Sequence, residues 1–460
     1  MRGKEAKRNM PIPPRFASLI GPSIILLGLG LGSGEIILWP YLVSNFGLGI
    51  IWAAVVGITF QFFINMEIER YSIVKGESIF VGFARYSRFS PYWFIFSTFI
   101  AWFWPGIIAA SAKILARLFG LARFDLLSIG LLILIGFILT LGPTLYKTVE
   151  RYQKVMIGFG VPLIAFITFY IAGKADWQAL GKGIFGLGEG YSFLPKNIPL
   201  LTFLGALAYS GAGGNLNLSQ SFYIKEKGYG MCKGTRGITS VLTGKARKIN
   251  LTGETFEKNE LNLKRFGSWW KLINLEHLLV FLLTGALAIL LLALLSYSTT
   301  QGLAGNLKGI DFLFAEAKAV GAIAFPYLGI LFLLVTGLML FGTQLTVLDS
   351  TSRIIAENIV IAENKVNLSK IYYTVLWLQI MAASAVFLAG FSEPVTLITI
   401  GAVINAFAMF VHIAATYLLN KKSLPKVLQI SSWRKAVIGL AWSMFGVLTV
   451  WALVDGIAKL

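Results

Sequence analysis

Eleven long apolar runs constrain the fold of this chain more than any other feature of its sequence. A helix needs about 20 apolar residues to cross the hydrocarbon core of a bilayer. Backbone polar groups at that depth must be paired inside the protein, and a helix pairs them within itself. The sequence therefore predicts an all-α membrane protein with 11 transmembrane helices. We expect these helices at residues 17–44, 49–70, 92–118, 126–144, 153–173, 198–223, 274–297, 322–348, 371–390, 394–419 and 434–455.

The distribution of charge predicts how the chain is oriented. Charged residues make up 13% of the chain, about half of the 25% that is typical of soluble domains. The net charge of +19 comes from Lys and Arg in the gaps between apolar runs, mainly in alternate gaps. Basic residues are retained in cytoplasmic loops. We therefore expect a multi-pass protein of the cell membrane (plasma or inner), with a cytoplasmic N-terminus, a lipid bilayer around it and no nucleic-acid partner.

Motifs of enzymes and cofactor sites are missing from the sequence. The single cysteine, Cys232, excludes an intrachain disulfide and a cysteine metal cluster. The sequence has no H-E-x-x-H motif, P-loop or Ser/His/Asp set. We therefore expect no enzymatic activity, no cofactor and no obligate protein partner. The first apolar run is also too long for the h-region of a cleavable signal peptide.

The first apolar run contains the most unusual local sequence, Gly28–Glu35, which reads GLGLGSGE. Each glycine weakens a helix by about 1 kcal/mol relative to alanine. The carboxylate of Glu35 follows directly, near the middle of a span, where charged groups are costly and usually functional. A glycine-rich packing surface with a snorkelling glutamate is the alternative interpretation.

A second glycine cluster, Tyr209–Asn217, interrupts the sixth run with the sequence YSGAGGNLN. Two glycine-interrupted spans at matching positions of two halves indicate a binding site in secondary transporters. A broken helix frees carbonyl groups at the end of one half and N–H groups at the start of the next. Carbonyls can replace the hydration shell of a cation, and N–H groups favour anions. Close helix packing is the alternative for this cluster alone.

These motifs resemble those of the natural resistance-associated macrophage protein (Nramp) type of divalent metal transporters. The start of the first span, Gly21–Ser23 followed by Gly32–Glu35, is similar to that family's G-P-G and D-P-G-N. Gly213–Leu216 falls where the family has P-H-N-L, and Gly342–Thr346 resembles its G-Q-S-S-T. The resemblance implies a leucine-transporter-like fold (APC superfamily) with an inverted 5+5 repeat, broken helices 1 and 6, and alternating access.

This resemblance also implies a division of the chain into segments. We expect a cytoplasmic N-terminal tail at 1–16, a first five-helix repeat at 17–173 and a second, inverted repeat at 198–419. The second repeat contains a cytoplasmic loop at 224–272, and 434–455 forms the eleventh helix.

The sequence departs from the Nramp pattern where that family binds metal. The family's metal-binding Asp falls on Gly32, its Asn on Glu35 and its Met on Ala212. Its proton-relay acids of the third helix fall on Trp104 and Ile107. One carboxylate therefore remains and the soft sulfur is lost, which favours a cation that prefers oxygen ligands, such as Mg²⁺ or Mn²⁺.

We accordingly expect a secondary transporter of a divalent metal cation, with Glu35 and Asn215 as metal ligands. The further candidate residues of the binding site are Gly32, Ser33, Tyr209, Asn217 and Asn405, the backbone carbonyls near Leu31 and Ser210, and the weaker candidates Thr343 and Gln344. An interhelical hydrogen bond is an equally good explanation for Asn405. The alternative function is a symporter of an amino acid or another organic solute, and a membrane enzyme or sensor that uses the 225–271 loop is a third possibility.

Overall fold

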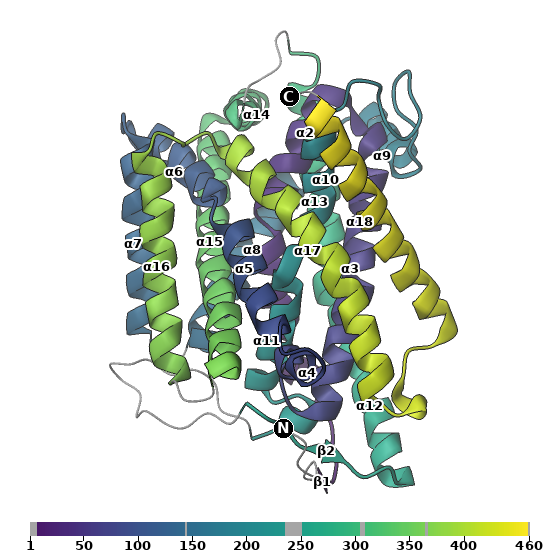
Figure 1. Ribbon diagram of the computed structural model, residues 1–460. Coiled ribbons are helices and arrows are strands. Elements are labelled where there is room, and N and C mark those ends of the chain that lie inside the picture. The colour runs from purple at the N-terminus through teal and green to yellow at the C-terminus, as the bar shows by residue number, and fades with distance from the viewer. Residues whose placement is uncertain (1–6, 143–144, 235–250, 304–308, 364–366, 459–460) are drawn as a thin grey trace.

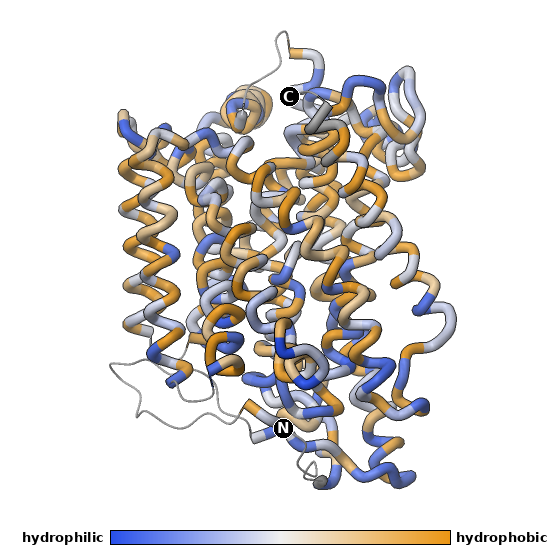
Figure 2. The backbone as a smooth tube through the Cα atoms, in the orientation of Figure 1, coloured by the Kyte–Doolittle hydropathy of each residue, from blue (hydrophilic) through white to orange (hydrophobic). Residues whose placement is uncertain are grey.

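The computed structural model describes residues 7–142, 145–234, 251–303, 309–363 and 367–458. The chain forms a bundle of helices with its N-terminus at one end and its C-terminus at the other (Figure 1). We call these ends the N-terminal face and the opposite face. Apolar residues dominate the middle of the bundle, and hydrophilic residues gather toward the two ends (Figure 2). Helices that cross a membrane show this distribution.

The described residues contain 10 helical segments that are long and apolar enough to cross a membrane. An eleventh span lies between the fifth and the sixth of these and is divided into two short helices, α10 (Leu200–Ala208) and α11 (Gln220–Lys227). The predicted all-α membrane architecture is confirmed, with both predicted interruptions present. The other helices of the first half are α1 (Pro22–Gly30), η2 (Ser33–Leu38), α2 (Trp39–Phe46), η3 (Leu48–Ile50), α3 (Trp52–Lys75), α5 (Ser90–Trp102), α6 (Gly106–Phe119), α7 (Phe124–Leu141) and α8 (Leu145–Ile171).

The second half also begins with a broken span, and the spans that follow it are continuous. Its further helices are η4 (Gly214–Ser219), α12 (Glu260–His277), η6 (Leu278–Leu283), α13 (Thr284–Thr300), α15 (Pro326–Glu363), α16 (Leu368–Leu388), α17 (Pro394–Ser423) and α18 (Ser432–Ala458). The division of the chain into two inverted repeats stays a prediction.

Several helices extend beyond the apolar runs that predicted them. α8 begins at Leu145 rather than 153, and α15 continues to Glu363 rather than 348. α12 begins at Glu260, inside the range 224–272 that was expected to be a loop, so that part of the expectation was wrong. An apolar run marks the part of a helix that crosses the hydrocarbon core. The helix itself can extend further where its polar side chains form hydrogen bonds or ion pairs. In α15 these extra turns carry buried polar residues such as Asp349 and Asn358.

The third span contains an interruption that the sequence analysis did not predict. α5 ends at Trp102 and α6 begins at Gly106, with Pro105 between them. Proline has no N–H for the helix ladder and clashes with the preceding turn, which explains the break. The break lies beside the interrupted sixth span, since Trp102 stacks on Tyr209 with 5.4 Å between ring centroids.

Shorter elements lie at the two faces of the bundle (Figure 1). The N-terminal face carries α4 (Ile79–Tyr86) and a parallel pair of short strands, β1 (Lys7–Arg8) and β2 (Thr255–Phe256). The opposite face carries α9 (Lys174–Ile184) and α14 (Asp311–Ile323). Three 3-10 turns are η1 (Phe16–Ser18), η5 (Gly230–Cys232) and η7 (Lys426–Leu428). These elements connect the spans at the ends of the bundle and leave its middle to the apolar helices.

The broken first span lies in the core of the bundle. Within its most apolar stretch 94% of the residues are buried, against 28% in α7 and 33% in α8. α1 packs against α15 and α8, and α10 packs against α17 and η2. The two glycine-rich interruptions are therefore enclosed by continuous helices, as irregular backbone at membrane depth requires.

A buried ion-pair cluster joins three helices toward the N-terminal face. Arg353 on α15 donates to both carboxylate oxygens of Asp349 at 2.9 Å and also pairs with Glu226 on α11. Tyr372 on α16 donates to Asp349 at 2.8 Å. The side chains of Arg353 and Asp349 are 2% and 0% exposed. The i,i+4 pair of Asp349 and Arg353 therefore belongs to a larger buried cluster.

We predict that Arg353→Met lowers the free energy of unfolding by about 3–5 kcal/mol, because it leaves a buried carboxylate without its counter-ion. Arg123→Met removes the cation of an exposed pair with Asp125, where Arg123 is 66% exposed, and should leave stability unchanged. Thermal unfolding of the two purified variants in detergent measures both. Equal unfolding midpoints would contradict the structural role of the cluster.

Candidate solute-binding site

The first interruption consists of Leu31 and Gly32, between α1 and η2. Thr343 on α15 lies against it, and its hydroxyl is 2.9 Å from each of the carbonyl oxygens of Gly28 and Leu31. A Cβ on Gly32 would come within 2.4 Å of the Thr343 methyl group, so glycine allows this approach. Thr343 therefore caps the open end of α1, and the Leu31 carbonyl, an expected cation ligand, is already hydrogen-bonded.

The second interruption runs from Tyr209 to Gly213, between α10 and η4. Gly211 and Gly213 have φ of +140° and +71°, which glycine adopts readily. Gln61 on α3 bridges the gap. Its Nε2 donates to the Ala208 carbonyl at 3.0 Å, and its Oε1 accepts from the N–H of Gly213 at 3.1 Å. The sequence analysis did not identify Gln61, although an amide inside the apolar run 49–70 was a possible signal.

The two interruptions contact each other directly. A Cβ on Gly34 would lie 1.8 Å from the carbonyl oxygen of Tyr209, so only the absence of a side chain lets these backbones meet. Trp39 on α2 donates to the Ser210 hydroxyl at 2.9 Å. The breaks predicted separately from sequence therefore form one region in the core.

The carboxylate of Glu35 lies in this region and is fully buried. A methyl group on Gly30 would be 2.8 Å from Glu35 Oε1 and 2.9 Å from the backbone of Gly211, which places the carboxylate at the junction of the two breaks. No side-chain donor reaches either carboxylate oxygen among the described residues, and only the backbone N–H groups of Gly32 and Glu35 lie near the carboxylate. Lys113, a conceivable counter-ion, pairs with Asp311 at 2.9 Å instead. A buried carboxylate without a side-chain donor or a counter-ion is costly, and it is the strongest indication that a cationic ligand belongs here.

The three predicted asparagines are all buried and all keep a free amide oxygen. Asn215 donates to Ser97 and Thr98 on α5, at 2.8 and 3.0 Å. Asn217 donates to Gln61 and Asn65 on α3, at 3.2 and 2.8 Å. Asn405 donates to the Tyr209 hydroxyl at 2.8 Å and to the Gly401 carbonyl at 3.1 Å. The Oδ1 atoms of Asn215, Asn217 and Asn405 have no hydrogen-bond partner among the described residues.

These contacts divide the predicted residues into two groups. Gly32, Ser33, Glu35 and Tyr209 lie at the two breaks. The nitrogens of Asn215 and Asn217 bond to neighbouring helices, and that of Asn405 bonds to Tyr209 and to its own helix. The interhelical hydrogen bond considered for Asn405 is present, and its Oδ1 lies against Gly214, where a Cβ would be only 1.7 Å away. The described residues contain no group of three or more His, Cys, Asp or Glu side chains suited to a metal ion. The binding roles of all these residues stay predictions.

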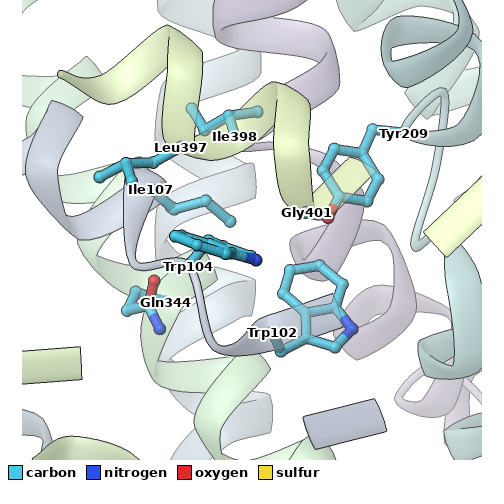
Figure 3. Close-up of a pocket in the computed structure, with 8 residues that line it drawn as sticks. All are labelled: Trp102, Trp104, Ile107, Tyr209, Gln344, Leu397, Ile398 and Gly401. Carbon is cyan, nitrogen blue, oxygen red and sulfur yellow. The ribbon is translucent and has the colours of Figure 1, made fainter. Parts of the chain in front are cut away.

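An aromatic pocket adjoins the sixth-span break (Figure 3). Its lining residues are Trp102, Trp104, Ile107, Tyr209, Gln344, Leu397, Ile398 and Gly401. Trp104 lies in the middle of the group, and Gln344 lies across the pocket from Tyr209. Leu397 to Gly401 belong to the first turns of α17, so the pocket lies between Tyr209 and the opposite face. Among these residues the sequence analysis had singled out only Tyr209 and Gln344 for the site.

No family model matches the sequence, and no curated protein matches it significantly. Solved structures show a clear similarity of fold. Two variants of the manganese transporter from Eremococcus coleocola are each 14% identical to this chain, with TM-scores of 0.66 and 0.68. The first alignment covers 98% of this chain and 89% of the transporter, and the second covers 99% and 90%.

Two further structures share the architecture. MhsT, solved in complex with L-phenylalanine, is 13% identical over 98% of this chain and 99% of its own, with a TM-score of 0.56. Mhp1, described as a nucleobase-cation-symport-1 family transporter with bromovinylhydantoin bound, is 13% identical over 96% and 92%, with a TM-score of 0.59. At these identities the similarity shows the fold, and the predicted leucine-transporter-like fold class is confirmed.

We predict that Gly34→Ala destabilises the protein by at least about 1–3 kcal/mol, the usual cost of overpacking, because its methyl group overlaps a backbone carbonyl. The matched control is Gly130→Ala on α7, where an added Cβ meets nothing within 4 Å. That change should stabilise the helix by up to about 1 kcal/mol. Thermal unfolding of both variants in detergent tests the pair. A Gly34→Ala variant as stable as the wild type would show that the two breaks do not touch.

Proposed function

We propose that this chain is a membrane transporter of the secondary type that moves a divalent metal cation by alternating access. The observation that carries the proposal is the fully buried Glu35 carboxylate, which has no side-chain donor or counter-ion among the described residues and lies at the junction of the two helix breaks. A divalent cation would offset the cost of burying that charge. With basic loops at its N-terminal face, the chain would lie in a cell membrane with that face in the cytoplasm.

The chemistry of the atoms at and beside the two breaks favours a hard cation. The Tyr209 carbonyl approaches the helix turn that carries Glu35, and free amide oxygens lie on Asn215 and Asn405. Sulfur is missing where the Nramp pattern has methionine, because Ala212 occupies that position. Carboxylate, carbonyl and amide oxygens suit Mg²⁺ or Mn²⁺ better than softer metals. The manganese transporter of the same fold supports this substrate class.

The test of this proposal is a comparison of Glu35→Gln with Glu363→Gln, a control at the exposed end of α15. A metal at 100 times its Kd stabilises the folded state by about 2.7 kcal/mol. We expect Mn²⁺ or Mg²⁺ to raise the unfolding midpoint of the wild type and of Glu363→Gln, but not of Glu35→Gln. Uptake into liposomes loaded with a metal indicator should be lost only in Glu35→Gln. Uptake by Glu35→Gln at the wild-type rate would refute Glu35 as the ligand.

A symporter of an organic solute is the second candidate, and the aromatic pocket favours it. Walls formed by Trp102, Trp104 and Tyr209 suit an apolar or aromatic side chain better than a hydrated ion. The amine of such a solute would pair with Glu35. MhsT with L-phenylalanine and Mhp1 with a hydantoin support this class to the same extent as the manganese transporter supports the first.

Trp104→Ala separates the two candidates. If the solute is organic, removing the indole should abolish stabilisation by the amino acid or hydantoin that stabilises the wild type, because the ring forms part of the pocket. If the solute is a metal ion, stabilisation by Mn²⁺ should be unchanged in Trp104→Ala. Thermal shifts with a panel of metals, amino acids and hydantoins measure both. Organic solutes that leave the wild-type midpoint unchanged would eliminate the second candidate.

A further inference from the structure

A chain of buried hydrogen bonds leads from the sixth-span break to two carboxylates. Asn217 donates to Asn65 Oδ1 at 2.8 Å, and Asn65 Nδ2 lies 3.2 Å from His277 Nε2. His277 Nδ1 lies 2.8 Å from the hydroxyl of Ser23, which donates to Glu276. These residues come from η4, α3, α12 and α1, and each is at most 1% exposed. The chain therefore connects the candidate site with a second polar region inside the protein.

In this series of hydrogen bonds, every donor faces the Glu276 end. Asn65 accepts from Asn217 through its oxygen, so its nitrogen is the atom that faces His277. An amide nitrogen can only donate, and His277 Nε2 must then be the acceptor. The proton of the neutral imidazole is consequently on Nδ1, which donates to Ser23. The chain ends at Glu276 as its final acceptor, and hydrogen bonds aligned in this manner polarise one another.

Around Glu276, where this series of hydrogen bonds ends, there are more acceptor oxygens than hydrogens to donate to them. Glu69 lies beside Glu276, with its Oε1 at 3.5 Å from His277 Nδ1 and at 2.8 Å from the Gln220 amide nitrogen that donates to it. Glu69 Oε2, Glu276 Oε1 and Gln220 Oε1 are buried without a hydrogen-bond partner among the described residues. All three are oxygens. A group of unpaired buried acceptors favours a bound proton, because protonation turns a carboxylate oxygen from an acceptor into a donor.

The nearby cations do not neutralise the carboxylates of Glu69 and Glu276. Lys227 on α11 is the cation that acts on Glu276, but its Nζ already bonds to Glu150 on α8 at 2.9 Å and to the Ile20 carbonyl at 3.3 Å. On α3, Arg70 is held by Glu67 at 2.8 Å. The other titratable groups near these two carboxylates are the neutral phenols of Tyr146 on α8 and Tyr229 beside η5. The Tyr229 hydroxyl donates to the Leu19 carbonyl, and the Tyr146 hydroxyl has no hydrogen-bond partner among the described residues. The carboxylates of Glu69 and Glu276 therefore have no counter-ion of their own, because Lys227 and Arg70 bond to other carboxylates.

We propose that Glu276, Glu69 and His277 form a proton-binding site coupled to the sixth-span break, and that its proton is the one exchanged for, or carried with, the transported solute. This assignment rests on the proposed transport function. It differs from the third-helix relay of the Nramp pattern, whose positions here are Trp104 and Ile107. The bound proton forms an O–H or N–H bond on one of the three groups and leaves from the same group to water.

The direction of these hydrogen bonds couples the proton site to the sixth-span break. A protonated Glu276 would donate to Ser23 instead of accepting from it, and Ser23 would then donate to His277 Nδ1. The proton of the neutral imidazole would move to Nε2, where the N–H would face the amide N–H of Asn65. Relief requires the Asn65 amide to rotate, which turns its nitrogen toward the nitrogen of Asn217. Asn217 also donates to Gln61, whose oxygen holds the N–H of Gly213. Proton binding is thereby transmitted to the backbone of the break.

The first experiment measures the proton site without relying on transport. Infrared difference spectra of the full chain in detergent, recorded between acidic and neutral pH, should show the C=O band of a buried protonated carboxyl. The double variant Glu69→Gln/Glu276→Gln should lose this band, and Glu260→Gln at the exposed start of α12 should keep it. An unchanged band in the double variant overturns the proposal.

Ser23→Ala provides a second variant if the double variant does not fold. It removes the hydroxyl between His277 and Glu276 and leaves both carboxylates in place. The pH midpoint of the carboxyl band should shift relative to the wild type. A midpoint identical to that of the wild type overturns the coupling of His277 to the carboxylates.

The second experiment measures coupling in liposomes that contain a pH-sensitive dye, with Mn²⁺ as the probe. We expect Mn²⁺ uptake by the wild type to be accompanied by proton movement. In Glu69→Gln/Glu276→Gln, proton movement should fall to the level of empty liposomes while Mn²⁺ still moves down its gradient. Proton movement retained in the double variant, or absent from an active wild type, overturns the coupling role. A wild type that moves no Mn²⁺ refutes the metal-transport function instead, and the infrared titration still decides whether the proton site exists.

Discussion

The contact between Gly34 and the carbonyl of Tyr209 is the constraint on which the arrangement of this bundle depends. An interrupted helix exposes N–H and C=O groups that cannot remain unpaired away from water. Two interruptions can share the core only if their backbones fit closely and neighbouring helices supply hydrogen bonds. Glycine at the contact provides the fit. The remaining helices then enclose a region where backbone groups and one carboxylate face each other.

Partners for the broken backbones come from the continuous helices. Thr343 on α15 caps the first break, and Gln61 on α3 bridges the second. Because each side chain must reach particular backbone groups of a break, its hydrogen bonds restrict how its helix is rotated in the bundle. The same helices carry the buried charge clusters toward the N-terminal face: Arg353 with Asp349 on α15, and Glu69 on α3. One set of helices thus connects the candidate solute site with the groups that can hold charge or protons.

The proposed solute site and the proposed proton site differ in the hydrogen-bonding partners that their carboxylates lack. At Glu35, a carboxylate is buried without any donor side chain among the described residues, so a cation of either class could be its partner. At Glu69 and Glu276, unpaired oxygens adjoin a histidine whose hydrogen bonds have a defined direction. Asn217 and Gln61 lie between the two regions and contact the second break. A change of protonation in one region therefore has a physical route to the backbone of the other.

The amino-acid sequence determined the membrane fold, because apolar runs of sufficient length permit few alternatives and a glycine cluster such as Gly28–Gly34 weakens the helix that contains it. It also indicated Glu35, since a carboxylate inside such a run needs a reason to be there. Tertiary structure decided the partners. Asn215 and Asn217 resembled free ligands in the sequence, but their nitrogens bond to α5 and α3, and Gln61 and His277 gained their importance only from residues more than a hundred positions away. Hydrogen-bond direction and helix rotation depend on which side chains meet across the bundle, and the spacing of residues along one chain does not contain that information.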